Sequence, residues 1–83
     1  MIEEKVTNLV KDVIENAGYI LDSVSYVKEG STKFLRIVVD KNGGYINVED
    51  CVTINGLVDP LIDTLDIEEN YILDICSKEK GEL

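Results

Sequence analysis

The spacing of apolar residues changes at Gly18, and this change constrains the fold more than any other feature of the sequence. Before Gly18, apolar residues recur every three or four positions, as in an amphipathic helix. They are Ile2, Val6, Leu9, Val10, Val13, Ile14 and Ala17. After Gly18, Val24 and Tyr26 alternate with serines, as in a strand with one buried face. We therefore expect a helix that ends at Gly18, where a left-handed cap costs glycine little, and then a first strand.

Two later segments also alternate and predict strands. Residues 33–40, KFLRIVVD, are rich in β-branched side chains and follow a short turn, so they should form a hairpin with the first strand. Residues 71–77, YILDICS, predict a third strand. The side chains expected to face the core are Leu35, Ile37, Val39, Tyr71, Leu73 and Ile75.

A second helical pattern lies between these two strands. Its apolar stripe comprises Cys51, Ile54, Leu57, Val58, Leu61, Ile62 and Leu65. Pro60 interrupts it, because proline forfeits a backbone hydrogen bond and crowds the preceding turn. We expect either a kink near Gly56 or a helix that restarts with Asp59 as its N-cap. Cys51 should be a small core residue, since it lies on the stripe.

The element order is therefore α-β-β-α-β, which predicts an α+β fold of two layers with a KH-like appearance. Two amphipathic helices should cover one face of a three-stranded sheet, and the connection between the second and third strands should be right-handed if these strands are parallel. The opposite face would then be open. By parity it should carry Phe34, Arg36, Val38, Ile72, Asp74 and Cys76. Apolar residues beside a lone arginine make this face a candidate docking surface.

The chain of 83 residues has room for one domain, and its formal charge is −9. This charge opposes general attraction to nucleic acid and favours basic partners. Four basic residues nevertheless gather in the hairpin region and are candidate contacts with a partner or with RNA. They are Lys28, Lys33, Arg36 and Lys41. The absence of a long apolar segment or a basic leader predicts a cytoplasmic chain without membrane contact, in which both cysteines are reduced.

The segment 38–51, VVDKNGGYINVEDC, has the composition of a ligand-binding loop but fails each test. In a calcium loop that begins at Asp40, Cys51 would replace the bidentate glutamate. A phosphate loop would need a lysine followed by serine or threonine, or a GxGxxG spacing. Turn chemistry fits better: the glycines allow positive φ, and Asn47 can cap a helix whose first turn is acidic.

No other group of residues predicts catalysis or a cofactor. The acidic residues of the second half have no defined metal geometry, and such runs are usually solvated. They include Asp59, Asp63, Asp66, Glu68 and Glu69. The chain has no histidine, and no carboxylate or lysine pairs with a nucleophile at a recognisable spacing. We therefore expect a protein that is not an enzyme and that binds neither metal nor cofactor.

The segments AGYILDSVSYVKEG, FLRIVVDKNGGYINVEDCVTINGLVDPLIDTLD and YILDICS resemble the N-terminal domain of the ribosome maturation factor RimP family. The resemblance covers about Ile2 to Ser77, and its most specific elements are Gly18-Tyr19, YVKEG, LRIVVDK followed by Gly43-Gly44, EDC and LVDPLID. Each motif is weak alone, but five in the same order are specific.

The resemblance implies a non-enzymatic, cytoplasmic factor that assists late maturation of the small ribosomal subunit. Its partners would be the immature particle, a basic ribosomal protein near the decoding centre and local rRNA. In the family, a small barrel domain follows. After Ser77 the family's Ser-Pro-Gly turn is missing, so we expect a domain at 1–77 and, at 78–83, a tail or the start of a linker to a barrel.

Two other interpretations are open at this point. The element order resembles RNA-binding KH modules, although the GxxG loop that clamps the backbone in those modules does not occur. A small-ligand regulatory or acylphosphatase-like domain would need another leading strand and an arginine and asparagine at an anion site. Arg36 is the only arginine and lies within a predicted strand.

Overall fold

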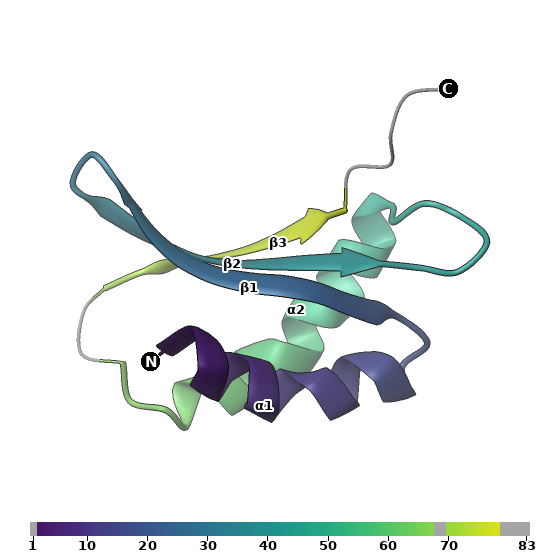
Figure 1. Ribbon diagram of the computed structural model, residues 1–83, viewed down its shortest axis with the longest axis horizontal. Helices are drawn as coiled ribbons and strands as arrows, with labels where there is room; N and C mark the ends of the chain where they lie inside the picture. Colours follow the sequence, from purple (N-terminus) through teal and green to yellow (C-terminus); the bar gives the residue numbers. More distant parts are fainter. Residues whose placement is uncertain (1, 68–69, 79–83) are drawn as a thin grey trace.

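The computed structural model describes residues 2–67 and 70–78, and it has the predicted element order and α+β architecture (Figure 1). In chain order the elements are α1 (Ile2–Asn16), β1 (Ile20–Glu29), β2 (Thr32–Asp40), α2 (Val48–Asp63) and β3 (Ile72–Ser77). The sheet order is β1-β2-β3. β1 and β2 are antiparallel, and β3 is parallel to β2, so the sheet is mixed.

Both helices lie on the same side of the sheet, and the other side is open (Figure 1). The fully buried side chains among the described residues come from α1, α2 and the central strand β2. They are Val6, Val10, Ile14, Leu35, Ile37, Val39, Ile54, Val58 and Ile62. Side chains from the outer strands, among them Val24, Tyr26, Leu73 and Ile75, pack around this core together with Tyr71, which precedes β3. The faces predicted for all three strands are confirmed.

Gly18 terminates α1, as the sequence predicts, two residues after the last helical residue, Asn16. Gly18 has a φ of +95°, its N–H donates to the Glu15 carbonyl at 3.0 Å, and the Tyr19 N–H donates to the Ile14 carbonyl at 3.1 Å. These two bonds are those of a Schellman cap, which satisfies carbonyl groups that a helix end leaves without partners. The cap turns the chain directly into β1.

β1 contains an irregularity that the sequence pattern did not predict. The register with β2 shifts between Leu21 and Ser23, so an extra residue lies in β1 at this point. Because a bulge changes the parity of the strand, Leu21 and Val24 both pack towards the core although they are three positions apart.

α2 is a single continuous helix that passes through Pro60, so the predicted restart at Asp59 is wrong. Pro60 and Gly56 are both exposed. Proline has no N–H, so Pro60 cannot donate a hydrogen bond to the Gly56 carbonyl. Because Gly56 lies on the solvent side of the helix, water can replace the missing donor.

The buried stripe of α2 is narrower than the sequence pattern indicated. Ile54, Val58 and Ile62 are buried at intervals of four residues, but Leu57 is 37% exposed and Cys51 is only half-buried. α2 packs against α1 and the edge strand β3. Because this contact covers a narrow strip of the helix, the assignment of Cys51 and Leu57 to the core is corrected.

Candidate functional site

The open face of the sheet is formed by residues of alternate parity to the buried ones. The register places Phe34 beside Ile72, Arg36 beside Asp74, and Val38 beside Cys76. On the other side of β2, these positions are paired with Val27, Ser25 and Ser23 of β1. Ile72 is 51% exposed, whereas the others on β2 and β3 are half-buried. The face has the predicted membership, and its role in docking stays a prediction.

Arg36 lies at the centre of this face and already has partners. Its Nε donates to Asp74 Oδ2 at 3.1 Å, and its second terminal nitrogen lies 3.8 Å from Glu29 Oε2. The guanidinium carbon is also 5.7 Å from the centroid of the Phe34 ring. The hydrogen bond with Asp74 raises the pKa of Arg36, so the group stays charged. The charge at the centre of the face is thus matched within the sheet.

The four basic residues singled out in the sequence do not form one patch. Lys28 and Lys33 are cross-strand partners near the hairpin turn, and the Lys33 ammonium lies 5.3 Å from the centroid of the Tyr26 ring. Lys33 has the parity of the core-facing residues, whereas Arg36 has that of the open face. Lys41 follows the opposite end of β2 and contacts α2. The hairpin pair is therefore the part of the basic region that the structure brings together.

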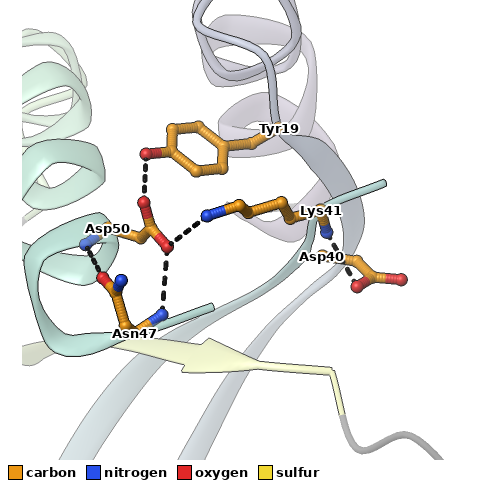
Figure 2. Close-up of polar contacts among 5 residues, drawn as sticks. All are labelled: Tyr19, Asp40, Lys41, Asn47 and Asp50. Carbon is orange, nitrogen blue, oxygen red and sulfur yellow. Dashed lines mark hydrogen bonds and ion pairs between the residues drawn. The ribbon is translucent and has the colours of Figure 1, made fainter. Parts of the chain in front are cut away.

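A polar network joins the α1–β1 connection, the end of β2 and the start of α2 (Figure 2). The Tyr19 hydroxyl donates to Asp50 Oδ1 at 2.7 Å, and Lys41 Nζ donates to Asp50 Oδ2 at 3.1 Å. The same Oδ2 accepts the Asn47 N–H at 3.0 Å, while the Asp50 N–H donates to Asn47 Oδ1 at 2.8 Å. These last two bonds form a capping box. The interpretation of segment 38–51 as a turn that leads to a capped helix is confirmed.

The network stabilises the charged form of Asp50. The Asn47 N–H, then the Tyr19 hydroxyl and the Lys41 ammonium, lower the pKa of Asp50 from 3.8 to about 2. The same carboxylate raises the pKa of Tyr19 through the hydrogen bond that it accepts. The spacing of Asn47 and Asp50 could have predicted the capping box, but no local pattern pointed to Tyr19 or Lys41. They meet Asp50 only because the fold brings the α1–β1 connection and the residue after β2 to the start of α2.

The structure contains a groove between α2 and β3 that the sequence patterns did not predict. It holds an open pocket of about 350 Å³ lined by Val48, Cys51, Val52, Asn55, Leu73 and Ile75. Val48 and Val52 are 79% and 67% exposed. These two valines lie on α2 outside the stripe that was assigned to the core. Apolar residues outside the core stripe were the one sign in the sequence that α2 has a second apolar surface. We call this feature the α2–β3 groove.

The two cysteines are free and half-buried. Burial is the main cause that raises the pKa of both thiols, which disfavours the thiolate. Within residues 2–67 and 70–78, no group of three or more potential metal ligands converges. Over the same residues, no helix is long and apolar enough to cross a membrane.

These features define a small α+β domain with one helix-covered face, one open sheet face and a groove along an edge strand. The model of the RimP N-terminal domain family matches residues 9–78, which span all three strands, α2 and the C-terminal half of α1. The chain therefore belongs to the RimP N-terminal domain family, a family of ribosome maturation factors. The resemblance seen in the sequence is confirmed.

Proposed function

We propose that this domain assists maturation of the small ribosomal subunit by docking to the immature particle in the cytoplasm, without catalysing a reaction. The observation that carries the proposal is the family match over residues 9–78. It covers every strand of the sheet, so the docking surfaces described above all belong to the matched region.

The charge of the chain supports a basic protein as the main partner. With 17 acidic and 8 basic residues, the domain is repelled by an RNA backbone as a whole and attracted to a basic ribosomal protein, such as one near the decoding centre. The open face adds apolar contact area through Phe34, Val38 and Ile72, around the neutralised pair of Arg36 and Asp74. This combination of apolar contacts around a matched charge suits a protein contact.

Local rRNA contact is proposed for the hairpin end of the sheet. Lys28 and Lys33 are paired across β1 and β2, so their charges project from one short region. Arg36 is less suited to this role, because an RNA phosphate would have to compete with Asp74 and Glu29.

Co-sedimentation with purified ribosomal particles tests the docking proposal. We expect the protein to migrate with immature small subunits in preference to mature small or large subunits, and the bound fraction should fall as salt is raised. Equal association with all three particles, or a response that does not depend on salt, would contradict an electrostatic docking function.

Charge reversal separates the rRNA contact from the protein contact. The double variant Lys28→Glu and Lys33→Glu should weaken particle binding severalfold more than the matched double variant Lys5→Glu and Lys11→Glu on α1, if rRNA meets the hairpin. If both double variants bind equally, the hairpin makes no rRNA contact, and the docking proposal then depends on the protein surfaces alone.

A further inference from the structure

The outer edge of β3 offers unpaired backbone groups. Within the described residues, β3 has β2 as its strand neighbour on one side and none on the other. The Lys78 N–H donates to the Val39 carbonyl at 2.7 Å, so the backbone at Lys78 faces β2. Because backbone groups alternate in direction along a strand, those of Leu73, Ile75 and Ser77 face outwards. They form a row to which another strand can bond.

Apolar surface lies directly beside this row. The side chains of Leu73 and Ile75 line the α2–β3 groove from the strand, and Val48 and Val52 line it from the helix. The two valines are largely exposed, and the pocket between the elements has a volume of about 350 Å³. A strand added to β3 would place every second side chain over this pocket, while the strand's backbone bonds to the outward row.

The pocket of the groove is lined by uncharged side chains, and the charges on the two elements that form it are acidic. α2 and β3 together contain Glu49, Asp50, Asp59, Asp63 and Asp74 and no lysine or arginine, but Asp50 is paired with Lys41, and Asp74 is paired with Arg36 on the open face. Asp59 and Asp63 lie near Tyr71, the residue that precedes β3. Burial is the main cause that raises the pKa of Tyr71, and the negative charges of these two carboxylates raise it further. Asp59 also follows Val48, Val52 and Asn55 along one side of the helix, at intervals of three or four residues. The groove thus passes from an apolar end to an acidic end.

We propose that the α2–β3 groove binds an extended segment of a basic polypeptide, which adds to β3 as a fourth strand. The inference deepens the proposed docking function and rests on it, since it assigns the surface that receives the basic partner. Alternate apolar side chains of the segment would enter the pocket beside Val52, and its lysines or arginines would face the carboxylates of α2.

The charge decides between the possible occupants of the groove. A second copy of this chain carries the same charge of −9 and would bring a second acidic α2 towards the first. Nucleic acid would be repelled by the same carboxylates. A basic, extended segment satisfies both the unpaired backbone row of β3 and the exposed carboxylates of α2.

A synthetic peptide tests this inference in the absence of ribosomal particles. The probe has about eight residues that alternate lysine with valine, and its binding is followed by fluorescence anisotropy. A second peptide has the same side chains but N-methyl groups on alternate amides, so that it cannot add as a strand. We expect the first peptide to bind and the second to bind at least about tenfold more weakly. Equal affinities would overturn strand addition.

Two matched variants locate the binding surface. Val52→Lys introduces a positive charge into the groove, and Thr53→Lys introduces the same charge on α2 outside the groove. Both residues are exposed, so neither change should unfold the domain, and circular dichroism checks this. We expect about a tenfold loss of peptide affinity for Val52→Lys and less than about twofold for Thr53→Lys. Equal losses, or a larger loss for Thr53→Lys, would overturn the assignment.

Hydrogen exchange gives a readout specific to the proposed geometry. Exchange at the amides of Leu73, Ile75 and Ser77 should slow when the peptide binds, because these amides gain hydrogen bonds. The amides of Asp74 and Cys76, which face β2, should change little. Protection confined to the second group, or no change in the first, would contradict a fourth strand.

Particle binding by the same variants separates failure of this inference from failure of the proposed function. If the unaltered domain and the Val52→Lys variant bind immature subunits equally, the groove inference is wrong while docking stands. If the unaltered domain binds no particle but binds the peptide as described, the groove is a peptide site and the ribosomal proposal fails.

Discussion

The two faces of β2 have similar apolar side chains but very different environments. Leu35, Ile37 and Val39 are fully buried beneath α1 and α2, whereas Phe34 and Val38 alternate with them and are only half-buried. Val38 and Val39 are adjacent and chemically identical. Their difference shows that burial in this domain depends on which face the helices cover, and that the uncovered face keeps apolar side chains partly exposed.

The polar interactions of the two faces also differ, because they connect different parts of the fold. On the covered side, Asp50 ties Tyr19 and Lys41 to the start of α2 and so joins helix and sheet (Figure 2). On the open face, Arg36 pairs with Asp74 of the neighbouring strand. The first network fixes the two layers relative to one another. The second only links strands that backbone hydrogen bonds already hold.

The largest expected effect tests the difference in burial with one substitution at neighbouring positions. Val39→Ala should lower the free energy of unfolding by about 2 to 3 kcal/mol, because it leaves a cavity in a packed core. Val38→Ala should lower it by less than about 1 kcal/mol, since Val38 loses less buried area. Urea unfolding measures both values. Equal losses would show that the two faces do not differ in the way the fold indicates.

A smaller effect concerns the cap that begins α2. Asn47→Ala should lower the free energy of unfolding by about 1 kcal/mol, because the Asp50 N–H loses its side-chain acceptor. Asn8→Ala is the matched control: Asn8 is exposed within α1, where alanine is the better helix former. Thermal or urea unfolding that shows similar losses for both variants would argue against a role of the capping box in stability.

The pH dependence of stability sharpens the comparison further. The pKa of Asp50 is about 2 in the folded domain and 3.8 ordinarily, so its stabilising contribution is present above pH 3.8 and is lost as the pH falls towards 2. Asp50→Asn should therefore flatten the dependence of unfolding free energy on pH within this window.

A second variant checks the cause of that pH dependence. Tyr19→Phe removes one donor to the carboxylate, so the pKa of Asp50 should rise, as NMR titration of the carboxyl carbon would measure. An unchanged Asp50 titration in Tyr19→Phe would mean that the hydroxyl does not stabilise the charged form.

The smallest expected effect is on the open face. Arg36→Met removes the partner of Asp74 but keeps much of the contact with Phe34, so it should lower stability less than Asn47→Ala does. The difference in stability between Arg36→Met and the unaltered domain should shrink as the salt concentration is raised, because the Arg36–Asp74 pair is partly exposed and salt screens it. A loss as large as that of Val39→Ala would show that the pair has a structural role comparable to the core.

The sequence patterns predicted all five elements, both faces of the sheet and the N-cap of α2, because these depend on residues a few positions apart. The bulge in β1 was not predicted, since one extra residue changes strand parity without altering composition. The continuity of α2 at Pro60 was left open by the sequence, from which a kink and a restart were both expected as alternatives. It depends on the solvent exposure of Gly56 and Pro60, which local spacing does not give.

The candidate sites were less predictable than the fold. Lys28, Lys33, Arg36 and Lys41 are close in sequence, but the structure assigns them to different faces and ends of the sheet. Cys51 belonged to a helical stripe by spacing, yet it lines a groove because α2 packs beside an edge strand.

By itself, the sequence determined the element order, the amphipathic faces, the acidic charge and the motifs of the RimP N-terminal domain family. These follow from local spacing and composition. Only the tertiary structure decided that Asp50 would collect Tyr19 and Lys41, that Arg36 would be paired with Asp74, and that a groove would lie beside β3. Each of these joins residues distant in the chain, and their meeting depends on how helices and strands pack.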